Sequence, residues 1–132
     1  MATNILNLLR QLPNDYRTSD LSLENSWQPY INVVENDNYI FVDVELAGIE
    51  PDNINIDFFN NQIEVKGRRQ HIYTDEIIHK NELLYGEFRR LINIPISVTN
   101  KESVKTSLQN GILHITIDKD VENRNRFSVS VE

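Results

Sequence analysis

The side chains that most often carry out chemistry are present in this chain, but their spacing matches no catalytic or metal site. His71, His79 and His114 lack the spacing of metal ligands, and there is no cysteine to join them. The serines lack a nucleophile-elbow context, and no GxxxxGK[ST] stretch is present that could cradle a nucleotide phosphate. We therefore expect a protein that is not an enzyme and that uses no cofactor and no metal.

Composition excludes further classes of function. The formal net charge of −7 at pH 7 argues against nucleic acid as a partner, because a phosphate backbone requires a basic face. No apolar run is long enough to predict a membrane span, and the N-terminus lacks the basic start of a signal peptide. The absence of cysteine fits a reducing compartment, so we expect a cytoplasmic protein.

Arg90 stands out because its strand pattern directs it inward. In the predicted strand 88–94 it shares a face with Phe88 and Ile92. Burying an unpaired charge lowers the stability of the fold by roughly several kcal/mol. We expect Arg90 to be buried and paired, with no partner assignable; the alternative is a twisted or bulged strand that lets Arg90 reach water.

The C-terminal segment RFSVSVE has the pattern of a strand, but the sequence shows no strand with which it would pair. Phe127, Val129 and Val131 alternate with serines, which predicts a half-buried strand. Residues 118–126 are almost entirely polar, so we expect them to be a solvated tether. The tip must then pair with something beyond the tether.

Residues 4–12 have the pattern of a short amphipathic helix that ends at Pro13. Residues 13–26 are mostly polar and offer this helix no core. The apolar stripe packs either on its own domain or on other subunits and foreign apolar surface. The apolar side chains of this N-terminal arm are Ile5, Leu6, Leu8, Leu9, Leu12, Leu21 and Leu23.

From Trp27 onward, short alternating segments bounded by turn residues predict seven strands. Asn110-Gly111 is a strong hairpin signal between the last two. The fold class expected is all-β, an antiparallel immunoglobulin-like sandwich. The predicted strands are 30–35, 39–46, 53–58, 62–66, 88–94, 103–108 and 112–117.

The connection 67–87 is long for a compact domain, which suggests that it has a role. It holds Ile72, Tyr73, Ile77 and Ile78, enough apolar side chains to form a strand between charged flanks. We expect this strand to pair with a second copy of the chain; the alternative is a loop that is mobile in solvent.

Several of these segments together resemble the small heat-shock proteins, which are built around an α-crystallin domain. The motifs are WQPYINVVEND, LAGIEPDNI, YGEFRRLINIP, SLQNGILHITIDK and the tail VSV. Asp118 departs from the pattern, because a proline often stands there. The resemblance implies an N-terminal arm (1–26), an α-crystallin domain (27–119) and a flexible C-terminal extension (120–132).

The resemblance also implies where the tail binds. Val129 and Val131 would dock in a groove between two edge strands of a neighbouring subunit. Burying two valines contributes about 3–6 kcal/mol before ordering costs, which corresponds to roughly millimolar affinity. The alternative is a tail that folds back on its own domain or stays disordered. The implied groove residues are Ile54, Ile56, Phe58, Val104, Thr106 and Leu108.

A dimer interface is implied as well. The long connection would exchange a strand with the opening strand of a second subunit, and Arg90 would lie near this contact. The implied interface residues are Arg90, Ile72, Tyr73, Ile77, Ile78, Tyr30 and Asn32.

Two functions from different classes remain. The first is an ATP-independent holdase active in stress response, which binds unfolding client proteins through the arm and the vacated groove, and which self-associates into homodimers and higher oligomers. The second is a monomeric β-sandwich adaptor that docks one folded partner.

Overall fold

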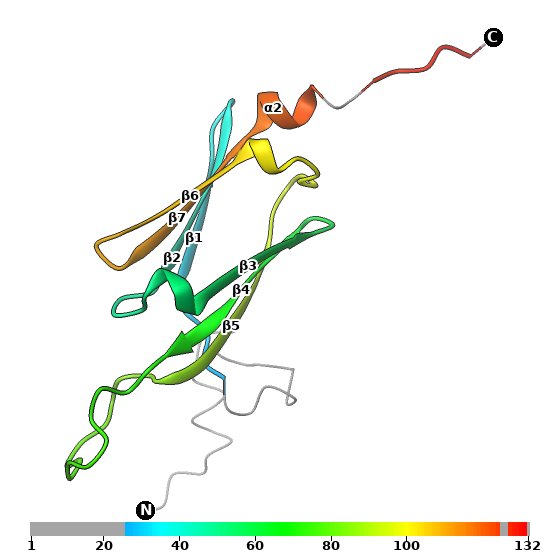
Figure 1. Ribbon diagram of the computed structural model, residues 1–132. Coiled ribbons are helices and arrows are strands. Elements are labelled where there is room, and N and C mark those ends of the chain that lie inside the picture. Colours follow the sequence, from blue (N-terminus) through cyan, green and yellow to red (C-terminus); the bar gives the residue numbers. More distant parts are fainter. Residues whose placement is uncertain (1–25, 125–126, 132) are drawn as a thin grey trace, which may run out of the picture.

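The computed structural model describes residues 26–124 and 127–131, which form a sandwich of two antiparallel sheets (Figure 1). All seven expected strands are present, which confirms the predicted all-β sandwich. The strands are β1 (Ile31–Glu35), β2 (Tyr39–Glu45), β3 (Ile54–Phe59), β4 (Gln62–Arg69), β5 (Gly86–Asn93), β6 (Val104–Gln109) and β7 (Ile112–Asp118). Short helices are η3 (Pro51–Asn53), η4 (Lys101–Ser103) and α2 (Lys119–Asn123).

Each sheet buries one apolar face against the other sheet. The four-stranded sheet has the order β1-β2-β7-β6, and the three-stranded sheet has the order β3-β4-β5. Because side chains alternate along a strand, every second residue of β2 and β7 enters the core, as do Ile63 and Val65 of β4. The core consists of Ile40, Val42, Val44, Leu46, Ile49, Ile63, Val65, Phe88, Ile92, Ile94, Leu113, Ile115 and Ile117.

Trp27 links the two sheets on one side of the sandwich. Its backbone forms a parallel bridge with Phe88, in which Trp27 N–H donates to the Glu87 carbonyl and Arg89 N–H donates to the Trp27 carbonyl, both at 3.0 Å. The chain then enters β1 within a few residues, so the edges of β5 and β1 lie on the same side. β3 and β6 are therefore the edge strands of the opposite side.

The β6–β7 hairpin confirms the prediction from the Asn110-Gly111 pair. Gln109 pairs with Ile112, and Asn110 and Gly111 have positive φ values of 53° and 78°. A turn of this kind matches the twist of the strands that it joins. The Gly111 carbonyl also accepts a hydrogen bond from Leu46 N–H at 2.7 Å, which ties the hairpin to the end of β2.

The connection between β4 and β5 is shorter than predicted, because β4 continues to Arg69 and β5 begins at Gly86. Residues 70–85 protrude from one end of the three-stranded sheet (Figure 1, lower left). They form no strand in the single chain, although their apolar content favoured one. Their backbone groups therefore make no ladder with the rest of the described chain.

The prediction that residues 118–126 form a solvated tether is wrong for the first part of that segment. Lys119–Asn123 form α2, which contacts η4. The Asp118 carboxylate caps this helix by accepting hydrogen bonds from Asp120 N–H at 2.9 Å and Val121 N–H at 3.3 Å. The polar composition was misleading because hydrogen bonds, rather than apolar burial, hold this segment to the domain.

Candidate functional site

The residues predicted to line the tail-docking groove lie along the edge strands β3 and β6, which together we call the docking edge. Thr106 is exposed, whereas the other predicted residues are partly buried against the core. An edge strand presents backbone N–H and C=O groups to an incoming strand, so the docking edge offers both apolar side chains and hydrogen-bonding groups. Its predicted residues are Ile54, Ile56 and Phe58 on β3 and Val104, Thr106 and Leu108 on β6.

The tail, residues 127–131, extends away from its own domain (Figure 1, red). Phe127, Val129 and Val131 are 86%, 78% and 99% exposed. Together they present an uncovered apolar row, because alternate side chains of an extended segment share a face. The tail thus carries the kind of surface that an open strand edge can bury.

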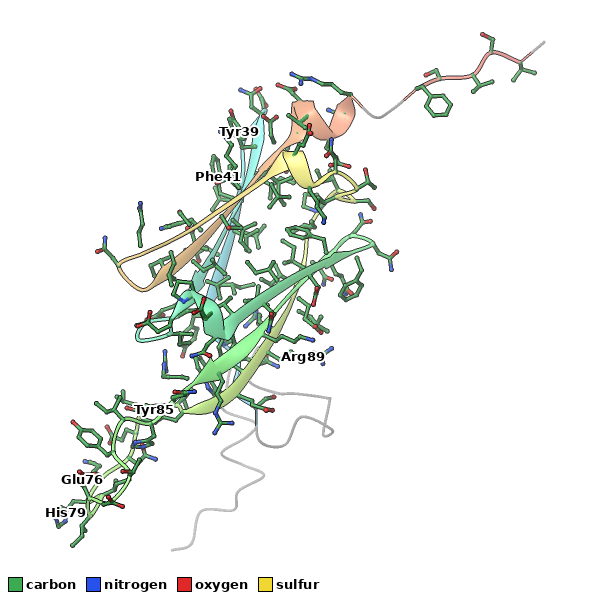
Figure 2. All side chains as sticks on the ribbon, in the orientation of Figure 1. Tyr39, Phe41, Glu76, His79, Tyr85 and Arg89 are labelled. Carbon is green, nitrogen blue, oxygen red and sulfur yellow. The ribbon has the colours of Figure 1, made fainter. Side chains whose placement is uncertain are left out.

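The loop 70–85 also exposes apolar side chains. Figure 2 shows this loop projecting from the domain, with Glu76 and His79 far out and Tyr85 near its base. The His71 ring stacks on the Tyr85 ring with 4.0 Å between centroids. The predicted interface residues of the loop are largely exposed: Ile72 (79%), Tyr73 (55%), Ile77 (83%) and Ile78 (51%).

Arg69 holds the base of this loop, and sequence reasoning missed it. Its Nε donates to the Ala47 carbonyl at 3.0 Å and its Nη1 donates to the Leu84 carbonyl at 2.8 Å. The guanidinium lies 4.5 Å from the centroid of the Trp27 ring, in cation–π geometry. Arg69 therefore links the end of β4 to the C-terminal end of the loop and to Trp27.

Arg90 is buried on the inward face of β5, as its strand pattern predicted. Its Nη1 donates to the Pro29 carbonyl at 3.3 Å, next to the start of β1. Tyr30 and Asn32, the predicted interface residues at β1, are exposed. Arg90 thus lies behind the open β1 edge, while its pairing across a dimer stays a prediction.

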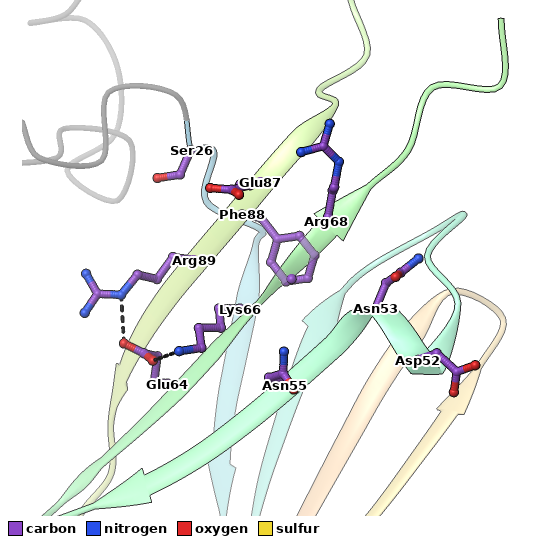
Figure 3. A pocket seen from close by; sticks show the side chains of 11 residues that line it. Ser26, Asp52, Asn53, Asn55, Glu64, Lys66, Arg68, Glu87, Phe88 and Arg89 are labelled. Atoms are coloured by element: carbon purple, nitrogen blue, oxygen red, sulfur yellow. Dashed lines mark hydrogen bonds and ion pairs between the residues drawn. The ribbon is translucent and has the colours of Figure 1, made fainter.

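The outer face of the three-stranded sheet carries a polar hollow of about 570 Å³ (Figure 3). In it the Glu64 carboxylate binds Arg89 Nε at 2.7 Å and Lys66 Nζ at 3.4 Å. The Arg89 hydrogen bond holds the pKa of Glu64 below its usual value, against the opposing effect of burial. Because this carboxylate is already paired across strands, the hollow is best explained as a solvated, ion-paired sheet face.

Glu122 is a second residue that sequence reasoning missed. It is only 8% exposed and belongs to α2. Its Oε1 accepts hydrogen bonds from the Thr99 N–H at 2.7 Å and from the Thr99 hydroxyl, while Oε2 accepts from the Asn100 N–H at 3.3 Å and the Ser103 hydroxyl at 3.0 Å. The only sequence signal was Asp118, a good helix N-cap residue in a segment otherwise typical of a tether.

Among the described residues, the other chemistry-bearing side chains form no larger site. His114 Nδ1 lies 2.7 Å from Asp43 Oδ1 on the outer face of the four-stranded sheet, as a cross-strand pair. Within residues 26–124 and 127–131, no group of three or more histidine, aspartate or glutamate side chains is placed to hold a metal ion. No helix in the same described residues is both long and apolar enough to cross a membrane. The predicted client-binding residues of the arm, Ile5 to Leu23, lie outside the described residues.

Comparison with known proteins identifies the domain. The Hsp20/alpha crystallin family matches residues 32–132. Small heat shock protein C2 of Rickettsia felis is 32% identical over 107 residues, which cover 80% of this chain and 69% of the relative. Small heat shock protein C4 of the same organism is 30% identical over 114 residues, which cover 85% of this chain and 66% of the relative.

Solved structures agree with this assignment. HSP18.5 from E. histolytica aligns with a TM-score of 0.64 and 25% identity, over 81% of this chain and 99% of that structure. Heat shock protein 16.0 from Schizosaccharomyces pombe has the same fold, with a TM-score of 0.65 and 22% identity over 81% of this chain and 100% of that structure. The chain therefore belongs to the Hsp20/alpha crystallin family, as a member of the small heat shock proteins.

Proposed function

We propose that this protein is an ATP-independent holdase, which binds the exposed apolar surface of unfolding proteins and keeps them from aggregating. The proposal rests on family membership, which supports a chaperone role, and on one observation: an uncovered apolar tail and an open docking edge occur in the same chain. Burial of apolar surface is not directional, so a surface of this kind accepts many clients with modest affinity.

In this proposal the tail of one subunit binds the docking edge of another. Val129 and Val131 would pack on the inward side chains of β3 and β6. Two buried valines give roughly millimolar affinity, so one tail alone holds poorly. Several tails acting together hold well, because each further contact is made within the assembly at a high effective concentration. The assembly can therefore stay intact while its subunits exchange, and a departing tail frees an edge for a client.

The dimer would form when loop 70–85 pairs with the exposed β1 edge of a second copy. Both His71 ring nitrogens are buried without a hydrogen-bond partner in the single chain. Buried polar groups are normally satisfied, so this supports a different arrangement of the loop once it is paired. Arg90 lies behind β1 and would help to fix that edge.

The clamp at the base of the loop yields a testable prediction. Replacing Arg69 with methionine keeps an apolar stem near Trp27 but removes hydrogen bonds to Ala47 and Leu84. The loop then loses its fixed direction, and we expect the dimer to dissociate about ten-fold more readily, equivalent to about 1.4 kcal/mol. Sedimentation across a dilution series measures this, with Arg68→Met, a change at the neighbouring exposed residue, as the control. Equal dimer constants for the two variants would contradict the clamp.

The holdase activity has a direct test. An aggregation-prone enzyme is warmed with and without this protein, in buffer without nucleotide, and light scattering is followed. We expect scattering to fall strongly at about one subunit per client, because coverage rather than turnover prevents aggregation. Serum albumin at equal mass is the control for nonspecific crowding. Identical scattering in the two samples would contradict the proposed holdase activity.

A further inference from the structure

The tail leaves the domain from α2, and α2 is too short to be stable alone. Isolated helices of this length are unstable in water, because the free-energy cost of nucleating a helix exceeds the stabilisation that a single turn of hydrogen bonds provides. Three side chains hold it in place: Asp118 caps its first turn, Lys119 Nζ donates to the Asn36 carbonyl at 2.7 Å, and Glu122 joins the helix to residues 99–103. Residues 99–103 are in turn fixed, since Ser103 N–H donates to the Asn100 carbonyl at 3.1 Å and Glu102 N–H donates to Asn100 Oδ1 at 2.9 Å.

The Glu122 contact is specific for a carboxylate. Each of its two oxygens accepts a separate pair of hydrogen bonds, so both must be acceptors. Burial alone would raise the pKa of Glu122, but the bonds from Thr99, Ser103 and Asn100 hold the pKa below its usual value of 4.5. Glu122 is therefore ionised near neutral pH, and its charge-assisted hydrogen bonds persist there.

We propose that Glu122 is the positioning residue of the tail: by binding residues 99–103 it fixes the point from which the tail leaves the domain, and so determines which neighbouring copy of this chain the tail reaches. Only residues 124–128 separate α2 from Val129, so Val129 reaches about 20 Å from the end of the helix. A docking edge beyond that radius is excluded while the Glu122 contact holds. This inference rests on the proposed docking of the tail on a second copy.

Loss of Glu122 should release the helix beyond Lys119 and lengthen the span between the domain and Val129 from residues 124–128 to residues 120–128. Effective concentration falls roughly as the −3/2 power of linker length, so each tail docks about two-fold less well. Subunits should therefore exchange at least about two-fold faster. The domain keeps its core, because α2 contributes no residue to the core cluster.

The experiment mixes two fluorescently labelled populations of the full chain and follows subunit exchange by energy transfer. Glu122→Ala should exchange at least about two-fold faster than the wild type. Glu122→Gln should lie between them, because its amide oxygen still accepts the bonds from Thr99. Asp120→Ala, at an exposed position of the same helix, is the matched control and should exchange at the wild-type rate. A wild-type rate for Glu122→Ala would overturn the inference.

A second measurement separates this inference from the proposed docking. A synthetic peptide of residues 127–132 is titrated into full-length chains that carry Val129→Asp and Val131→Asp, with and without Glu122→Ala. We expect equal binding to both, because Glu122 acts on where the tail starts and not on the docking edge. Weaker binding to the Glu122→Ala chain would show a structural role and overturn the positioning role. No binding to either chain would overturn the docking itself.

Discussion

A chain in which aspartate replaces both Val129 and Val131 should sediment as a dimer, whereas the unmodified chain should form larger assemblies. The proposed docking would bury two valines in the wild type, which contributes about 3–6 kcal/mol. An unpaired carboxylate on the same apolar edge costs at least a few kcal/mol, so each aspartate turns a favourable contact into an unfavourable one. The dimer should survive, because loop 70–85 and β1 contribute no residue to the tail contact.

The matched control replaces Ser128 and Ser130 with aspartate. It adds the same charge to the same tail, but on the face opposite to the valines, because successive side chains of an extended segment alternate. We expect this control to keep the large assembly in sedimentation and light scattering. If both variants dissociated, the effect would be net charge and not docking. If the unmodified chain were already a monomer, the adaptor function would be favoured over the holdase.

The strands could be predicted from sequence because their signals are local. Ile40, Val42 and Val44 alternate with polar or less buried residues along β2, and this period is visible without any knowledge of neighbours. The Asn110-Gly111 turn is equally local, since its residue types tolerate the positive φ that the hairpin needs. Arg90 was correctly placed inward by the same rule.

The parts that escaped prediction depend on partners far away in sequence. The Trp27 bridge to β5 joins positions about sixty residues apart, and nothing in the residues around Trp27 indicates it. Arg69 gives no local sign that it binds the Ala47 and Leu84 carbonyls. α2 was missed because its only buried side chain is charged, so a hydrophobicity pattern could not detect it.

The docking edge was only partly predictable from the sequence. Its side chains were predicted from family resemblance, whereas the order of strands within each sheet shows that β3 and β6 are edge strands. Asp118 shows how a departure from the family pattern acquires a role: where a proline often stands, the aspartate caps α2 and places Glu122 over residues 99–103. In the proposal made above, Asp118 and Glu122 thus fix the point from which the tail leaves the domain, whereas the VSV tip resembles the family motif.

Gly67 belongs to β4 and lies opposite the start of β3, at one end of the docking edge. A Cβ atom at this position would lie 1.9 Å from the Asn53 carbonyl oxygen and 2.7 Å from Phe88 Cζ. Asn53 ends η3, and the next residue, Ile54, pairs directly with Gly67 in the β3–β4 ladder. The clash is with backbone, so it cannot be relieved by turning a flexible side chain. Any larger residue must push the start of β3 away from β4.

Gly67→Ala should therefore lower stability by about 3 kcal/mol, the upper part of the usual range for overpacking, and lower the Tm by more than about 10 °C. Circular dichroism melting of the full chain measures this. Gly48→Ala is the matched control: Gly48 has a φ of 76° but nothing within 4 Å of its would-be Cβ, so that variant bears only backbone strain, about 1–2 kcal/mol. A smaller loss for Gly67→Ala than for Gly48→Ala would contradict the close approach. Because Ile54 moves with the strand, Gly67→Ala should also weaken tail docking and accelerate subunit exchange, whereas Gly48→Ala should leave both unchanged.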